Sequence, residues 1–341
     1  MPADSAASSP SRFWLVTAMA VIVVVWSLNY SIAKIGFGYL RPLALASFRI
    51  VAAGLAMIPL AVYCELAARR QAGRAQRQGQ VTQCQAGSAQ RQAASELTGG
   101  PRRTTRGDLW TYAYLGFFGI FLNQGSFTLG LSRTSVGHSA IVVATGPIFI
   151  LLAACTQGLE RLTRRKVLGL TVAFAGAMVL GAGRGWDLRS VGSQGDLLTF
   201  GAVISVTIFT VLAKRVARFH DALRLNAYNA VFAGLFASPV AIWQGLELTR
   251  AGAWGAVGWQ GWAVVCYMGV LSSALCYSLY FWVLRALPPS KLGALSYLQP
   301  VVGTPFAALV LGEPLTSDLV AGGALILAGV YTIESDTSEE A

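Results

Sequence analysis

Apolar residues in this chain gather into long runs, and short polar segments separate the runs. Most runs reach the ~20 residues that a helix needs to cross a ~30 Å hydrocarbon core. The pattern therefore predicts an all-α membrane protein with ten transmembrane helices, of which the fifth and the tenth are short. The helices are expected at 14–33, 43–64, 109–131, 139–159, 167–182, 196–213, 225–243, 259–284, 292–311 and 319–333.

The second half of the chain repeats the first half at an offset of 153 positions, without a gap from Leu122 and Leu275 onward. The recurring residues are Pro147, Glu160, Leu162, Thr163, Gly169, Ala175 and Gly176, which correspond to Pro300, Glu313, Leu315, Thr316, Gly322, Ala328 and Gly329. A proline, an acidic turn and two glycines in one register indicate a duplication of five helices. Because five is an odd number, the repeats would insert in opposite orientations, an architecture common among secondary transporters, whose binding site lies where the halves meet.

Composition and the repeat set the boundaries along the chain. The first residues are small and polar, and the last are acidic. We therefore expect a disordered N-terminal tail at 1–12, a first repeat at 13–183, a second repeat at 194–333 and an acidic C-terminal tail at 334–341.

The first repeat contains an insertion between its second and third helices. Lys34 and Pro59 align with Lys214 and Pro239 at an offset of 180, so the insertion adds 27 residues. The segment 66–107 is rich in Ala, Gln, Arg and Gly, and its composition predicts a disordered basic loop in the cytosol. The alternatives are an amphipathic helix on the inner leaflet and a docking segment for RNA or a protein partner.

Charge predicts the topology. The chain carries 26 Lys and Arg against 15 Asp and Glu, a net charge of +11. With the amino terminus in the cytosol, nineteen basic residues fall in inward-facing segments and six in outward-facing ones, or eleven against six without the 66–107 loop. Both termini are therefore expected in the cytosol, with the protein in the plasma or inner membrane. The basic clusters lie between apolar runs, which fits anionic lipid better than nucleic acid.

Composition and missing motifs exclude several classes of protein. Apolar residues make up 55% of the chain and charged residues 12%, roughly half the usual charged share of a soluble domain. The sequence lacks the GxxxxGK[ST] phosphate loop, HExxH and GxSxG, and its five cysteines form no CxxC pair. Carboxylates are almost absent from the predicted helix interiors, where an enzyme would need them. We therefore expect no enzyme, cofactor or metal site.

Neutral polar and aromatic side chains lie inside the predicted helices, where contact with lipid would be costly. Asn29, Asn123, Asn229 and Tyr277 represent four different helices, which favours a shared cavity. The alternative is that the amides only bond neighbouring helices, at about 1 kcal/mol each. The candidate substrate-cavity residues are Trp26, Asn29, Arg49, Asn123, Gln124, Asn229, Tyr277, Tyr280 and Gln299.

Two further features leave two interpretations each. Arg49 is the one basic residue inside a predicted helix. It could extend to the outer interface, or it could face the cavity and bind a substrate carboxylate through its guanidinium. Pro147 and Pro300 are both expected in mid-helix, where each removes a backbone bond. Their matched positions favour a pair of hinges, and the alternative is a pair of packing kinks.

These residues resemble the EamA branch of the drug/metabolite transporter superfamily. The resemblance rests on Trp26-Ser27-Leu28-Asn29 with Lys34, Pro42 and Arg49, on Pro147 with Glu160-Arg161-Leu162-Thr163 and Gly169 to Gly176, and on Tyr297-Leu298-Gln299-Pro300, Gly312-Glu313-Pro314-Leu315-Thr316 and Gly322 to Gly329. It covers nearly the whole chain apart from the tails and the 66–107 insertion. It implies two inverted five-helix EamA repeats, a central cavity and transport, often export, of amino acids or similar metabolites. The first repeat departs from the second in having Arg161 in place of Pro314.

The expected function is secondary transport of small organic metabolites, without ATP, by alternating access around the cavity. One rival is a non-transporting scaffold or sensor. Another is a nucleotide-sugar or phosphate exchanger, which would need several basic residues in the cavity. The expected partners are a small-molecule substrate and membrane lipid, with the chain acting as a monomer or homodimer.

The topology can be tested at Cys84, near the centre of the 66–107 segment. In a variant that keeps this cysteine alone, an impermeant maleimide should label inside-out vesicles and leave intact cells unlabelled. Labelling of intact cells would reverse the predicted orientation of every helix.

Overall fold

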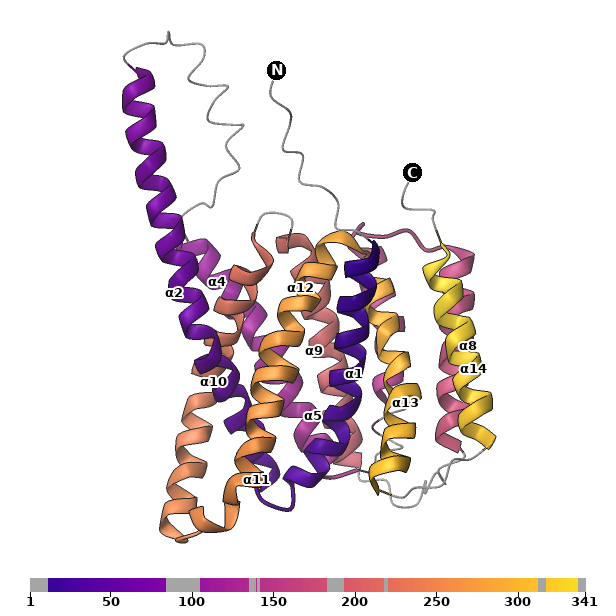
Figure 1. The fold of residues 1–341 in the computed structure, drawn as a ribbon. Helices are drawn as coiled ribbons and strands as arrows, with labels where there is room; N and C mark the ends of the chain where they lie inside the picture. The colour runs from indigo at the N-terminus through magenta and orange to yellow at the C-terminus, as the bar shows by residue number, and fades with distance from the viewer. Residues whose placement is uncertain are drawn as a thin grey trace.

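The computed structural model describes residues 12–83, 105–134, 139, 142–182, 193–217, 220–311 and 317–336. In this part of the chain all regular structure is helical, and the helices stand side by side in one bundle (Figure 1). Within these described residues, five helices are long and apolar enough to cross a membrane: Arg12–Gly36, Pro42–Arg70, Gln194–Ala217, Ala222–Arg250 and Trp254–Ala286. The prediction of an all-α membrane protein is therefore confirmed, and the count of ten crossings stays a prediction.

The helices overlap every range expected from the sequence. In chain order they are α1 (Arg12–Gly36), α2 (Pro42–Gln83), α4 (Arg106–Gly116), π-helix η1 (Phe117–Leu122), α5 (Asn123–Leu131), α7 (Gly146–Thr156), α8 (Arg164–Ala182), α9 (Ser193–Ala217), α10 (Ala222–Arg250), α11 (Trp254–Cys266), π-helix η2 (Tyr267–Leu275), α12 (Cys276–Ala286), α13 (Pro289–Leu311) and α14 (Ser317–Glu334). Three consecutive elements, α4, η1 and α5, form one continuous rod. The residues from Trp259 through η2 and α12 form another, which begins after a kink in α11 at Gly258 (φ 57°).

Helix α2 is longer than expected. The prediction of a disordered segment at 66–107 is wrong for residues 66–83, which continue α2 beyond the rest of the bundle (Figure 1). Ala, Gln and Arg have high intrinsic helix propensities, so such a segment can be helical without burying a core. Glu65 and Arg69 add an ion pair one turn apart, at 3.4 Å. Residues 84–104 of the expected loop lie outside the described residues, and its last two residues, Arg106 and Gly107, already belong to α4.

The two prolines occupy different places in their helices. Pro147 lies in the first turn of α7, just after a turn at Thr145, so its prediction as a mid-helix residue is wrong. Proline is favoured there because the first N–H groups of a helix have no intrahelical partner. Pro300 does lie within α13. The hinge role of the pair stays a prediction.

The secondary structure follows the offset of 153 closely. The two π-helices end at Leu122 and Leu275, the residues from which the sequence match runs without a gap. Helices α8 and α14 begin at Arg164 and Ser317, again 153 positions apart. A duplicated local structure, including the rare π-helix, therefore accompanies the duplicated sequence.

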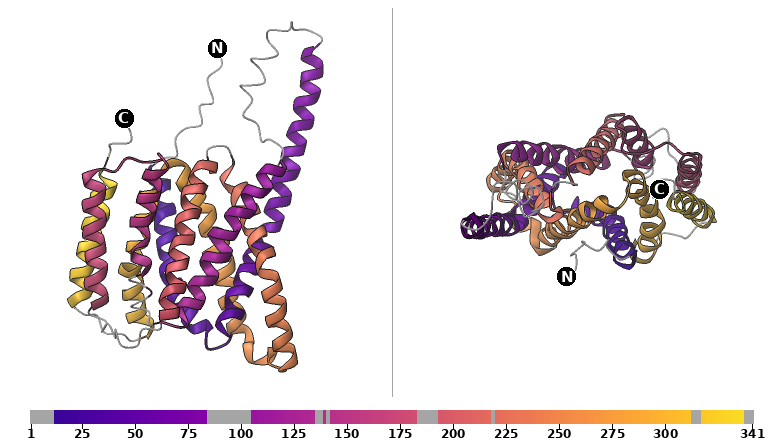
Figure 2. Two further views of the ribbon diagram at one scale, coloured as in Figure 1. Left: turned by 180° about the vertical axis from the view of Figure 1, so that it is seen from behind. Right: turned by 90° about the horizontal axis from the view of Figure 1, so that it is seen from above.

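The last helices of the two repeats pack against each other through glycines. A Cβ atom on Gly169 would lie 2.7 Å from the Gly329 carbonyl oxygen, and one on Gly176 would lie 2.7 Å from the Gly322 carbonyl oxygen. Early residues of α8 thus meet late residues of α14, so the two helices run in opposite directions. The pair stands at one edge of the bundle in both side views (Figures 1 and 2). Small residues allow this close approach of two backbones.

A second symmetric contact joins α2 and α10. Gly54 and Gly234 are 180 positions apart, the offset of the early part of the repeat, and a Cβ on Gly54 would lie 3.1 Å from the Gly234 Cα. Other contacts occur in equivalent pairs: α1 packs on α13, and α9 packs on α7. The two repeats therefore interlock rather than forming separate domains.

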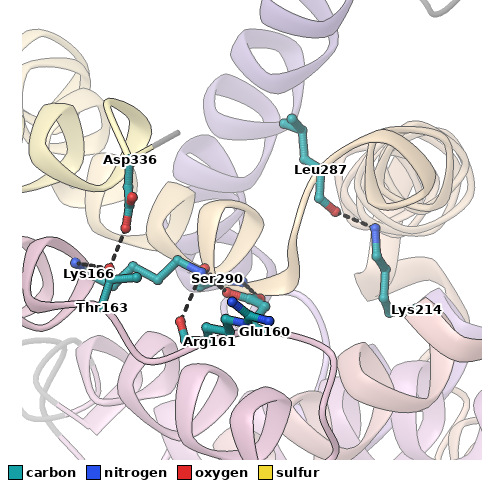
Figure 3. Close-up of polar contacts among 8 residues, drawn as sticks. All are labelled: Glu160, Arg161, Thr163, Lys166, Lys214, Leu287, Ser290 and Asp336. Carbon is teal, nitrogen blue, oxygen red and sulfur yellow. Dashed lines mark hydrogen bonds and ion pairs between the residues drawn. The ribbon is translucent and has the colours of Figure 1, made fainter. Parts of the chain in front are cut away.

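Helix α1 begins and α14 ends at the same end of the bundle (Figure 1). The α7–α8 and α12–α13 connections meet at this end as well (Figure 3). We call it the basic end because Arg161, Lys166 and Lys214 lie there. Positive charge predicts that it faces the cytosol.

We expect Gly329→Ala to destabilise the α8–α14 contact. The new Cβ would lie 2.5 Å from both the Ala173 nitrogen and the Gly169 carbonyl oxygen, so backbone would have to move, at a cost of about 1–3 kcal/mol. The matched control is Gly323→Ala on the same helix, whose Cβ would meet only a Val301 methyl at 3.9 Å. Thermal unfolding in detergent should show a lower midpoint for the first variant alone, and equal midpoints would contradict the proposed packing.

Candidate functional site

A cavity of about 160 Å³ lies between helices of the two repeats. Its walls come from α1, α2, α5, α7, α9, η2, α12 and α13. Eight of the nine residues proposed from the sequence line it: Trp26, Asn29, Arg49, Asn123, Gln124, Tyr277, Tyr280 and Gln299. Side chains that are more than 250 positions apart in the chain therefore converge on one site.

Asn229 is the exception. It is fully buried on α10, and it does not line the cavity. A Cβ on Gly116 would lie 2.6 Å from its carbonyl oxygen, so Asn229 belongs to the tight contact between α10 and α4. Neither atom of its amide group has a hydrogen-bond partner among the described residues.

Four aromatic rings form one wall of the cavity. Trp26 packs on Tyr277 and Tyr280 with ring centroids 5.7 and 5.9 Å apart. Phe209 on α9 packs on the same two tyrosines at 5.7 and 6.0 Å. The Tyr280 hydroxyl is hydrogen-bonded to the Thr210 hydroxyl at 2.7 Å. The rings are thus held in place and present aromatic faces to the cavity.

The π-helices hold several of these side chains. The Tyr277 hydroxyl donates to the Gly119 carbonyl oxygen of η1 at 2.7 Å, and the Trp26 indole N–H donates to the Ser272 carbonyl oxygen of η2 at 3.0 Å. Ser205 on α9 donates to the Phe118 carbonyl oxygen at 2.7 Å. Each of these three bonds connects a helix of one repeat to a π-helix of the other repeat. The wider π turns therefore anchor the cavity wall.

Arg49 contributes a buried positive charge. The residue is 2% exposed, and its Nη2 lies 3.4 Å from the Ser273 hydroxyl, a long and neutral contact. Ser273 in turn donates to Gln124 Oε1 at 2.9 Å. The Arg49 Nε has no hydrogen-bond partner, and none of the described side chains that line the cavity is a carboxylate. Arg49 therefore does not extend to the outer interface, and its charge is uncompensated by the described residues.

An amide group adds an acceptor. Asn29 lies on α1 and is 7% exposed, and its Oδ1 has no hydrogen-bond partner among the described residues. Asn123 differs, because its Nδ2 donates to the Ala202 carbonyl oxygen at 2.9 Å. Two residues that line the cavity thus carry buried polar atoms without partners among the described residues: a donor, Nε of Arg49, and an acceptor, Oδ1 of Asn29.

Sequence patterns did not single out several other lining residues. They are mostly apolar or small: Tyr30, Phe127, Val203, Val206, Phe209, Ile150, Gly293 and Ser296. An apolar residue inside an apolar run gives no signal of the direction that it faces. Ser273 was recognisable as part of a polar face of its helix, although its contact with Arg49 required the fold.

The cavity has room for a small organic molecule. An apolar cavity of ~150 Å³ can hold benzene. Within the described part of the chain, no three His, Cys, Asp or Glu side chains gather as metal ligands would. The site therefore suits reversible binding of a small solute by hydrogen bonds, aromatic faces and one positive charge.

A bundle of apolar helices that meets around a partly polar cavity is an architecture typical of membrane transporters. The chain belongs to the EamA-like transporter family, whose model matches residues 93–182 and 193–335. The two matches fall in the two repeats.

Several known proteins are similar over much of their length. An uncharacterized transporter of Archaeoglobus fulgidus is 23% identical over 94% of this chain and 98% of its own. An uncharacterized transporter of a Synechocystis species is 26% identical over 62% of this chain and 67% of its own, and a WAT1-related protein of Arabidopsis thaliana is 26% identical over 67% and 65%. A protein of known crystal structure has a TM-score of 0.65 at 20% identity, with coverage of 95% and 98%, which shows the same fold.

Proposed function

We propose that the protein is a secondary transporter that exports small organic metabolites, amino acids or related compounds, across the plasma or inner membrane. The observation that carries this proposal is the cavity, because it lies between the repeats and is lined by two residues, Arg49 and Asn29, with buried polar atoms that no described residue satisfies. Such atoms are expensive in a protein interior unless a ligand or water completes their bonds.

We further propose that the carrier works by alternating access between inverted repeats. The opposite directions of α8 and α14 support this, because these helices are equivalent in the two repeats. Paired contacts such as α1 with α13 and α9 with α7 also support a two-fold relation. If the repeats exchange conformations, the cavity opens first to one side and then to the other.

Arg49 is proposed to bind a substrate carboxylate. A buried guanidinium without a counter-ion is strongly unfavourable, and a planar carboxylate can accept two of its N–H groups at once. The free Nε and the weakly bonded Nη2 lie on one side of the guanidinium, in the geometry of such a pair. The substrate class that fits is a solute with one carboxylate and little net charge.

The rest of the cavity suits the other end of an amino acid. Asn29 Oδ1 can accept a hydrogen bond from an ammonium group. The faces of Trp26, Tyr277 and Tyr280 attract cations and also pack against apolar or aromatic side chains. A zwitterion would satisfy the donor and the acceptor together.

The rival functions have less support. A scaffold or sensor does not require a polar cavity at the contact of its repeats, whereas this bundle has one. A nucleotide-sugar or phosphate exchanger would need several converging cations, and Arg49 is the one basic side chain among the described cavity residues.

Uptake into proteoliposomes, screened over amino acids with and without a proton gradient, tests the function. Asn29→Ala should raise the apparent KM of a transported amino acid roughly ten- to a hundredfold, the worth of one hydrogen bond to a charged ammonium group. Asn229→Ala is the matched control, because it removes an equally buried amide outside the cavity and should leave KM unchanged. No transport of any solute would refute the function, and equal KM changes in both variants would refute the site.

The carboxylate proposal is tested with Arg49→Lys and Arg49→Gln. Lysine keeps the charge and loses the planar fork, and glutamine loses both. Both should raise the apparent KM for a free amino acid, by roughly ten- to a hundredfold for a bond to a charged group. An amidated analogue of the same amino acid should be affected far less. Equal losses for the two solutes would mean that Arg49 acts through its contact with Ser273 and not on the substrate.

A further inference from the structure

A buried carboxylate joins the repeats at the basic end of the bundle. Glu160 lies in the α7–α8 connection, and its side chain is 0% exposed. Its Oε1 accepts a hydrogen bond from the backbone N–H of Ser290 at 2.8 Å, and its Oε2 accepts one from the Ser290 hydroxyl. Ser290 is in the first turn of α13, 130 positions further along the chain (Figure 3). A residue of the first repeat therefore caps a helix of the second.

The cap has a counter-ion. Lys166 Nζ donates to Glu160 Oε2 at 2.8 Å, and its side chain is 1% exposed. The first N–H groups of a helix lack intrahelical partners and carry partial positive charge, so they stabilise a carboxylate. With the lysine and the helix both contributing, the Glu160 charge is well compensated. Removing either partner would leave a buried charge with fewer bonds, which is strongly unfavourable.

Glu160 acts on a helix that forms part of the cavity wall. Ser290 is followed on α13 by Gly293, Ser296 and Gln299, all of which line the cavity. At Gly293 the helix lies against α7, where a Cβ would meet the Ile150 side chain at 3.2 Å and the Pro147 Cα at 3.5 Å. The cap thus holds α13 against α7 between the cavity and the basic end.

Further bonds at the same end hold the connections on either side of the cap. Lys214 Nζ on α9 donates to the carbonyl oxygens of Leu284 and Leu287 at 2.7 and 2.8 Å, which fixes the α12–α13 connection. The Thr163 hydroxyl donates to Asp336, which joins the start of α8 to the end of α14 (Figure 3). Glu160 is the member of this set that bonds to the first turn of a cavity helix.

We propose that Glu160 is a positioning residue of the transport cycle. Its cap on α13 keeps the cavity closed toward the basic end, and the cap has to release when the cavity opens there. The proposal rests on the proposed transport function, because a bundle that never opens would use the same bonds as a permanent support.

The test measures access to the cavity from each side of the membrane. Cys64, Cys84, Cys155, Cys266 and Cys276 are replaced, and Ser296→Cys places one thiol on the cavity wall. A small charged methanethiosulfonate reagent is then applied to either face of sealed vesicles of known orientation. No substrate is needed, so the result does not depend on which solute is transported.

In this background Glu160→Gln should raise the labelling rate from the basic end about tenfold, a population shift of about 1.4 kcal/mol. Labelling from the opposite side should fall, because the conformation open to the basic end is closed to the opposite end. Lys166→Met should act in the same direction, since it leaves the carboxylate without its counter-ion. The control is Glu247→Gln, which breaks a solvent-exposed pair with Arg250 at 3.5 Å and should change neither rate.

Unchanged labelling in a folded Glu160→Gln variant would overturn the proposal, and so would an equal increase from both sides, which indicates general loosening. If Glu160→Gln does not fold, Ser290→Ala gives the answer: it removes the hydroxyl bond and keeps the N–H bond to Glu160. It should raise labelling from the basic end by a smaller factor, and no change would again overturn the proposal. Wild-type transport with unaltered access in these variants would refute the role of Glu160 alone.

Discussion

Inside a membrane-spanning bundle lipid cannot satisfy a polar group, so the protein, a ligand or water in a cavity has to do so. Two sets of buried polar groups in the described residues differ in how they are satisfied, and further buried groups, such as the Asn229 amide, lie outside both sets. At the basic end they satisfy each other, as Glu160, Lys166 and Ser290 do. In the cavity they do not, because Arg49 Nε and Asn29 Oδ1 have no partners among the described residues. The contact at Glu160 therefore needs no further partner, whereas the cavity residues need a ligand or water to complete their hydrogen bonds.

The π-helices recur in both repeats, and their backbone carbonyl groups bind side chains of the cavity. Each lies in the third helical rod of its repeat, and each ends one residue before Asn123 or Cys276, from which cavity-facing residues continue. The wider turn brings side chains from elsewhere onto backbone carbonyl groups, as with Tyr277 on Gly119 and Trp26 on Ser272. Because the feature occurs at equivalent positions in both repeats, it dates from before the duplication or arose under the same demand in each.

The sequence predicted the repeat, the helical ranges and most polar members of the cavity, because buried amides and matched glycines are rare in apolar helices. The sequence could not show that Asn29 lines the cavity and Asn229 does not, because both are amides inside apolar helices. The two residues differ in what their helix face contacts: the cavity for Asn29, and helix α4 for Asn229. Phe209 was invisible for the opposite reason, as one apolar residue among many. The segment 66–83 cannot build a core, and its composition therefore favours disorder over the alternative of a helix, although helix propensity depends on local backbone and side-chain entropy and not on a core.

The tightness of the glycine contacts indicates which helices can separate. Between α8 and α14 a Cβ on Gly329 would lie 2.5 Å from backbone atoms, so the two backbones touch and cannot slide without a clash. Between α7 and α13 the approach is looser: a Cβ on Gly293 would meet the end of the flexible Ile150 side chain at 3.2 Å and its nearest backbone atom, the Pro147 Cα, only at 3.5 Å. Contacts through side-chain ends can rearrange by rotamer changes, whereas backbone contacts cannot. Motion that opens the basic end would thus separate α13 from α7 while α8 and α14 move together as a pair. Glu160 lies in the connection between α7 and α8, and therefore joins the helix that separates from α13 to the pair that stays packed.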